Sequence, residues 1–230
     1  MTVNMDTLKS IDIFSGVSLA AGGILLQYAH LRTYKKNEYI FRDKEKTDHF
    51  YCIVDGTVSL YKLSALMEKR GIFIYGNGAT LNEDSIDGKP PSVNACALRN
   101  SKLLLIKRIV LREAFTKDPT LFEAFCKSMA MKTRRLYHLM KNTTTNLRGD
   151  RRIAAKLWKL SRDFGKETEL GTEINFDLSI AMFAEFLGSQ RETVSRQVKL
   201  LCDSGVIIVR KSRFTIPCRN NLLEYFNEDR

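Results

Sequence analysis

Over the first hundred residues, apolar positions fall in short runs rich in Ile, Val, Tyr and Phe, separated by turns such as Asp55-Gly56 and Asp87-Gly88. Runs of this length and composition are typical of β-strands. They predict strands at residues 30–34, 38–42, 50–54, 58–62, 71–75, 93–98 and 102–106, after a helix near residues 5–13. Many short strands at regular spacing indicate a sandwich or barrel. The runs beside Asp55-Gly56 are expected to pair as a hairpin, because this dipeptide suits a type I′ turn.

The pattern becomes helical after Lys107. Asp118 is a capping residue and Pro119 suits the first helical position, so a helix is expected to begin there. The next twenty residues carry a stripe on one side of a long helix, formed by Phe122, Phe125, Met129, Thr133, Leu136 and Met140. This stripe either packs on the helix's own domain or pairs with a second copy of the chain. We favour pairing, because a long helix beyond a compact β module needs a cover for its apolar side.

Two further segments lead to the C-terminal part of the chain. The polar residues 142–146 interrupt the helical pattern and indicate a hinge. The helix that follows carries Ile153, Leu157, Trp158 and Leu160, and Gly165 is expected to form its C-terminal cap.

The most informative stretch lies between Asp177 and Ile216. An apolar helix at residues 179–187 is expected to end at Gly188, since glycine adopts the left-handed conformation without strain. Residues 189–192, Ser-Gln-Arg-Glu, match a capping box and predict the start of a second helix. Two helices joined through a glycine-containing turn form the helix-turn-helix pattern.

The second helix has Val194, Val198 and Leu201 on its inner side, and its first turns expose polar side chains. In a helix-turn-helix protein that end enters the major groove of DNA, where Arg can bind guanine through two hydrogen bonds. Two short strands at residues 206–209 and 214–216 enclose a basic turn. This hairpin is either a wing that contacts phosphates or a solvated turn.

Charge supports a polyanionic partner without identifying it. The 230 residues carry a formal net charge of +11, of which residues 1–100 contribute +1, residues 101–147 contribute +7 and residues 148–230 contribute +3. Five scattered cysteines and three scattered histidines give no spacing for a disulfide framework or a metal site. No apolar run is long enough to span a bilayer and the N-terminus lacks a signal-peptide pattern, so a cytoplasmic protein is expected.

These features together resemble the cyclic-AMP-receptor/fumarate-nitrate-regulator (CRP/FNR) family of bacterial transcription factors. Residues 187–196, Leu-Gly-Ser-Gln-Arg-Glu-Thr-Val-Ser-Arg, are similar to the recognition-helix signature of that family, and residues 50–58 resemble its roll core. The resemblance implies an α+β chain. It would have a jelly-roll-like antiparallel β-roll sensor at residues 1–112, a long dimerisation helix with hinge at 113–146, and a winged helix-turn-helix at 147–230.

The resemblance also implies partners and site residues. The partners would be double-stranded DNA with a palindromic operator, a second copy of the chain and RNA polymerase. Arg191, Glu192, Ser195 and Arg196 would read bases. With the wing and the flanking positions, the expected DNA contacts are Ser189, Gln190, Arg191, Glu192, Thr193, Ser195, Arg196, Lys199, Lys211 and Arg213.

The chain departs from the family in its sensor. Members that bind cyclic nucleotides carry Gly-Glu and then Arg followed by a small hydroxyl residue, whereas this chain has Asn82-Glu83 and Pro91-Ser92. Without the arginine a buried cyclic phosphate would lack its counter-charge, so the effector is expected to be a different, unidentified one. No cysteine precedes Cys52, which argues against an N-terminal iron–sulfur cluster. No cofactor is predicted. Ile180 also replaces a usually polar, phosphate-contacting residue.

Two other functions are alternatives to an effector-controlled DNA-binding regulator. The first is an enzyme in the β-rich half, near His30 and His49, although no metal spacing or nucleophile motif supports it. The second is a basic protein that binds nucleic acid without sequence choice, which equal affinity for random and palindromic duplexes would favour.

Overall fold

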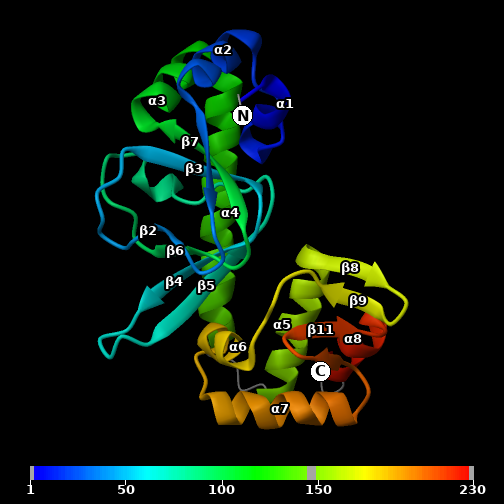
Figure 1. Cartoon of the computed structure of the whole chain (residues 1–230). Coiled ribbons are helices and arrows are strands. Elements are labelled where there is room, and N and C mark those ends of the chain that lie inside the picture. The colour runs from blue at the N-terminus through cyan, green and yellow to red at the C-terminus, as the bar shows by residue number, and fades with distance from the viewer. Residues whose placement is uncertain (1–2, 144–148, 228–230) are drawn as a thin grey trace. The chain divides into compact units, whose positions relative to one another are not determined.

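The structure is a computed structural model that describes residues 3–143 and 149–227 (Figure 1). The chain divides into two compact units, one built from Met1–Lys62 and Ile72–Thr144 and the other from Leu63–Gly71 and Thr145–Arg230. Antiparallel sheets, a long helix and a C-terminal helix-turn-helix confirm the predicted fold class. The β-roll and the long helix consist of α1 (Met5–Lys9), η1 (Asp12–Phe14), α2 (Leu19–Tyr28), β1 (His30–Tyr34), β2 (Tyr39–Phe41), β3 (His49–Asp55), β4 (Val58–Leu63), β5 (Lys69–Tyr75), η2 (Glu83–Ser85), β6 (Asn94–Ala97), β7 (Ser101–Lys107), α3 (Arg108–Lys117) and α4 (Pro119–Thr143).

The strands of the roll form two sheets, in the orders β1-β7-β3 and β2-β6-β4-β5. Successive side chains of a strand point to opposite faces, so β3 and β7 supply two cores. Tyr51 and Ile53 belong to a core that takes side chains from both sheets, and Phe50 and Cys52 belong to a second core shared with the helices. All seven predicted strands are present. The helices α2 and α3 were not predicted.

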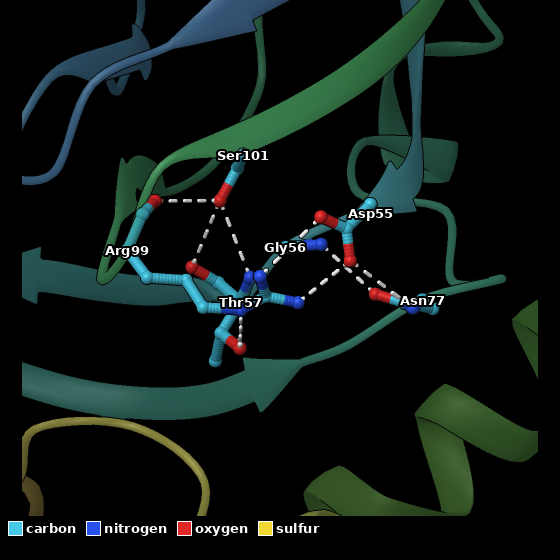
Figure 2. A network of polar contacts seen from close by, with 6 residues as sticks. All are labelled: Asp55, Gly56, Thr57, Asn77, Arg99 and Ser101. Atoms are coloured by element: carbon cyan, nitrogen blue, oxygen red, sulfur yellow. Dashed lines mark hydrogen bonds and ion pairs between the residues drawn. The ribbon is translucent and has the colours of Figure 1, made fainter.

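The Asp55-Gly56 turn does not close a hairpin, which corrects the sequence prediction. β3 pairs with β7 and β4 pairs with β6, so the turn carries the chain from one sheet to the other. Gly56 has φ +144°, and a Cβ there would lie 2.4 Å from Ser101 Cβ. The Arg99 guanidinium binds Asp55 Oδ1 at 2.8 Å, and Asn77 Oδ1 accepts from the Gly56 amide at 2.9 Å (Figure 2). Long-range contacts, rather than the local dipeptide, therefore determine this turn.

Helix α4 has two stripes with three- and four-residue spacing. The inner stripe is buried or half-buried and comprises Leu121, Phe125, Ser128, Lys132, Arg135 and Leu139. The outer stripe is exposed in the single chain and comprises Phe122, Cys126, Met129, Thr133, Leu136 and Met140. Phe125 is 1% exposed and its ring lies 5.9 Å from that of Phe50, so its assignment to the outer stripe was wrong. Cys126 takes that place in the outer stripe. The inner stripe packs on the helix's own domain, and pairing of the outer stripe with a second copy stays a prediction.

Asp118 connects the N-terminus of α4 to the N-terminus of α2. Its carboxylate is buried and accepts hydrogen bonds from the Leu121 amide (3.1 Å) and from the Thr120 amide (3.1 Å) and hydroxyl (2.6 Å), as expected for an N-cap. It also accepts from the Ser18 amide at 2.8 Å, at the start of α2. The hydrogen bond from the Thr120 side chain, followed by that from Ser18, holds the pKa of Asp118 well below its usual range.

We expect Asp118→Ala to lower the free energy of unfolding at pH 7 by about 2–3 kcal/mol, because it removes one cap and leaves the Ser18 amide unpaired. Since the pKa is depressed in the folded state, this contribution is complete above the ordinary carboxyl pKa of about 3.9 and is lost as the pH falls below it. Urea unfolding of both proteins at pH 7 and pH 3 measures the difference. An equal difference at the two pH values would contradict this account.

The second unit contains α5 (Gly149–Phe164), β8 (Gly165–Thr168), β9 (Gly171–Ile174), α6 (Ile180–Leu187), α7 (Arg191–Asp203), β10 (Ile208–Arg210), β11 (Arg213–Ile216) and α8 (Arg219–Asn227). Its sheet has the order β10-β11-β9-β8, and the hairpin of β8 and β9 was not predicted. Its core includes Ile153, Leu157, Phe183, Val194 and Ile216. None of the helices in the two described ranges is long and apolar enough to cross a membrane.

Two expectations about helix ends need correction. Gly165 does not have a positive φ and begins β8, so it is not a left-handed cap. A Cβ there would lie 2.0 Å from the Ser161 carbonyl oxygen, so glycine is needed because the two backbone segments approach closely. The expected hinge at residues 142–146 begins inside α4, which continues to Thr143. The rest of that hinge lies outside the described residues.

Candidate nucleic-acid interface

The turn between α6 and α7 orients the second helix. Gly188 caps α6 with φ +61° and ψ 39°, as predicted, and its amide donates to the Ala184 carbonyl. The predicted capping box is absent: α7 begins at Arg191, its N-cap is Gln190, and no side chain makes the capping hydrogen bond. The amide of Ser189 instead continues the C-terminal bonding of α6, donating to Ala184 at 3.1 Å. The turn between the two helices is therefore formed by the left-handed Gly188 at the end of α6 and not by a capping box at the start of α7.

A charged residue from α5 holds the same turn. The Arg152 guanidinium donates to the Leu187 carbonyl at 2.7 Å, directly before Gly188. This satisfies one of the carbonyls that the end of α6 leaves unpaired. Sequence reasoning missed Arg152, because its partner lies 35 residues away and no local motif connects the two.

Helix α7 has a buried side and an exposed side. Val194, Val198 and Leu201 are 0%, 5% and 0% exposed, which confirms the predicted inner side. The opposite side and the first turn expose most of the predicted contact residues, namely Gln190, Arg191, Glu192, Ser195, Arg196 and Lys199, whereas Ser189 and Thr193 are half-buried. The exposed polar groups therefore lie together on one face of a helix whose other face is fixed in the core.

The wing is a two-residue hairpin. Val209 pairs with Phe214 and Arg210 with Arg213, leaving Lys211 and Ser212 as the loop. Lys211 is exposed and has φ +57°, a left-handed conformation that L-residues rarely adopt. The Ser212 carbonyl accepts from the Leu178 amide at 2.8 Å, which ties the loop to the segment before α6. The Lys211 ammonium thus extends from a fixed loop.

The basic residues of the interface fall into two groups. The Arg213 guanidinium lies 3.0 Å from Asp177 Oδ1 and 3.6 Å from Glu173 Oε1, so carboxylates of its own unit already bind it. In contrast, the side chains of Arg191, Arg196, Lys199 and Lys211 have no hydrogen-bond or ion-pair partner among residues 3–143 and 149–227. These four remain available to bind an external anion or base.

In the roll, the segment that resembles a phosphate cassette is bound to its own chain. The Asn82 side chain accepts from the Tyr51 amide at 3.1 Å and donates to the His49 carbonyl at 2.9 Å. The Ser92 amide donates to Asp84 Oδ2 at 2.9 Å. A carboxylate of the chain therefore takes an amide donor that could otherwise bind an anionic ligand.

Comparison with known proteins matches two separate parts of the chain to two family models. Residues 31–118 match the model of the cyclic nucleotide-binding domain, and residues 151–225 match that of the Crp-like helix-turn-helix domain. The "CRP-like cAMP-activated global transcriptional regulator" of Mycobacterium tuberculosis is 24% identical over 88% of this chain and 90% of its own. The "Anaerobic regulatory protein" of Bacillus subtilis is 25% identical over 86% of this chain and 88% of its own.

A solved structure supports the fold. The structure of FixK2 from Bradyrhizobium japonicum superposes with a TM-score of 0.74 at 22% identity, covering 85% of this chain and 96% of that one. The matched domains and relatives therefore define a transcription regulator of the CRP/FNR type, with a roll like that of the cyclic nucleotide-binding domain and a DNA-binding helix-turn-helix. The chain belongs to the CRP/FNR family.

Proposed function

We propose that this regulator is a homodimer that binds a palindromic DNA site through α7 and responds to an effector other than a cyclic nucleotide. The observation that carries the proposal is the exposed face of α7, where Arg191, Arg196 and Lys199 are free of partners within the described residues. Arg191 and Arg196 have the fork that binds guanine O6 and N7, and Glu192 can accept from a cytosine amino group. Ser189, Gln190, Thr193 and Ser195 would complete the contacts to bases and backbone.

Lys211 is assigned to phosphate, since a flexible ammonium on a fixed loop supplies charge without base selectivity. Arg213 was expected to do the same. Its pairing with Asp177 and Glu173 favours a role in stabilising the wing.

The outer stripe of α4 supports the dimer. Its residues recur at spacings of four and three, the repeat of a coiled-coil seam, and they are exposed in the single chain. In a parallel two-fold dimer each seam residue faces its own copy, so Cys126 would lie opposite the partner's Cys126. Two α7 helices related by this axis would enter successive major grooves, and a palindrome is the matching DNA.

The polar contacts of the roll support an effector other than a cyclic nucleotide. The Ser92 amide already donates its hydrogen bond to Asp84, and Pro91 stands where cyclic-nucleotide-binding members carry arginine. A buried cyclic phosphate would therefore lack both the amide and the arginine as donors. RNA polymerase is proposed as the further partner on the strength of the family alone.

Selection of bound duplexes from a random library, using the full chain, tests the proposal. We expect enrichment of an inverted repeat whose half-site centres lie about 10 base pairs apart or a multiple of that. Equal recovery of all sequences, with strong salt dependence, would instead identify a non-selective nucleic-acid binder. Repeating the selection with added cyclic AMP tests the effector, and the enrichment should not change.

A further inference from the structure

A buried charge pair joins the roll to α4. The Glu83 carboxylate in η2 is 4% exposed, and Glu83 Oε2 lies 2.5 Å from the Lys132 ammonium, whose side chain is 16% exposed. Lys132 also donates to the Thr80 carbonyl at 2.5 Å, and its nitrogen lies 4.6 Å from the centre of the Tyr75 ring. A buried carboxylate needs a counter-charge, and α4 supplies it.

The groups around this nitrogen are those that a primary ammonium requires. An ammonium has three donors and no acceptor, and it is attracted to the face of an aromatic ring. Lys132 meets a carboxylate, a carbonyl and the Thr80 hydroxyl, at 3.3 Å, under the Tyr75 ring. The second Glu83 oxygen accepts from the Thr80 hydroxyl and, at 2.9 Å, from the Ser128 hydroxyl. The groups described around the Lys132 nitrogen are therefore three oxygen acceptors and a ring face, which suit a cation with N–H donors.

The position of Lys132 on α4 relates the contacts of the inner stripe to the direction of the outer stripe. Toward the N-terminal end the inner stripe is apolar, with Leu121 and Phe125 in the core of the roll. Ser128 and Lys132, the next two residues of the stripe, meet the roll through polar contacts. At about 100° of rotation per residue, the outer stripe lies roughly a quarter-turn from Lys132. The Lys132–Glu83 contact thus adds a polar restraint, beyond the apolar packing of Leu121 and Phe125, on the rotation of α4 about its axis and on the direction in which the outer stripe faces.

We propose that the roll contains a primary-ammonium site, occupied by Lys132 of the chain's own α4, and that this occupant sets the orientation of the outer stripe. The site is formed by Glu83, Thr80 and Tyr75, with Ser128 supporting the carboxylate. Its second role rests on the proposed function, in which the outer stripe is the dimer seam.

Chemical rescue tests the site itself. Lys132→Ala removes three carbons and the nitrogen, the atoms of n-propylammonium. We expect added n-propylammonium chloride to raise the thermal unfolding midpoint of Lys132→Ala saturably, by several degrees more than sodium chloride or 1-propanol at equal concentration. The rise should be absent in Lys132→Ala/Glu83→Gln, which lacks the carboxylate. It should also be absent in the matched control Lys127→Ala, which removes an exposed lysine from the same helix. Equal responses in all three variants would overturn the ammonium site.

Cross-linking tests the orientation of the outer stripe. In a Cys202→Ser/Cys218→Ser background, a short bismaleimide should join Cys126 of the two copies. We expect Lys132→Ala to lower the yield at least fivefold and n-propylammonium to restore it. Glu83→Gln keeps the shape of the site and should lower the yield equally. An unchanged yield in both variants would overturn the orienting role. If the unmodified chain gives no cross-link and selects no palindrome, the proposed dimer fails, while the melting experiment still decides the ammonium site.

Discussion

An Arg196→Ala variant is expected to retain its dimer and its fold but to lose preference for the palindrome that the unmodified chain selects. Arg196 is exposed on the outer face of α7 and has no partner within the described ranges, so the substitution removes no contact that stabilises the unit. A bidentate arginine–guanine contact contributes about 1–3 kcal/mol of discrimination, or a factor of about 5 to 150 at each half-site. Titrations against the palindrome and a scrambled duplex measure this ratio.

Two control variants separate base reading from charge. Arg196→Lys keeps the positive charge and loses the planar fork, so it should lose selectivity almost as fully as the alanine variant. Lys211→Gly removes one charge at a position whose φ of +57° glycine tolerates, so the wing should remain intact. We expect it to weaken binding to both duplexes alike and to reduce the slope of log affinity against log salt by about 1 per protomer. Full palindrome preference in Arg196→Ala would refute the assigned readout.

Local signals predicted the elements that local chemistry determines. Gly188 ends α6 in the left-handed conformation that glycine adopts without strain. Asp118 caps α4 by accepting hydrogen bonds from the amides that follow it. The turn at Asp55-Gly56 has an equally clear local signal, yet it joins two sheets because the pairing partners of β3 and β4 lie in β7 and β6. Strand pairing is a long-range property, so the dipeptide could indicate a turn but not its partner strands.

The same distinction applies to the functional surfaces. The polar face of α7 was predicted, because it depends only on the three- and four-residue spacing of apolar residues within that helix. The contacts of Arg152 with Leu187 and of Lys132 with Glu83 span 35 and 49 residues, and no sequence pattern marks them. On α4 the spacing placed Phe125 in the wrong stripe, because positions 125 and 126 both fit a three- and four-residue repeat. The burial of Phe125 against the rings of Phe50 and Phe115 separates the two stripes, and that packing is not visible in the sequence.

A Leu136→Glu variant is expected to be monomeric and to bind DNA as a single half-site reader. Leu136 is 42% exposed in the single chain and lies in the C-terminal half of the outer stripe, where a parallel dimer would place it opposite its own copy. The substitution removes apolar burial from both helices and brings two carboxylates together in a seam without counter-charges. A cost of about 3 kcal/mol or more corresponds to at least a hundredfold weaker dimer.

Sedimentation equilibrium measures the loss of the dimer, and titration with whole and half palindromes measures its consequence for DNA. The affinity of Leu136→Glu for the palindrome should fall to that of the unmodified chain for one half-site, because the two α7 helices are no longer linked. Arg134→Glu is the matched control, since Arg134 is exposed on α4 outside both stripes and should leave the dimer intact. A Leu136→Glu chain that remains dimeric and keeps full palindrome affinity would show that the two copies associate through another surface. In that case the exposure of the outer stripe would need a different partner, and the opposed Cys126 pair would not exist.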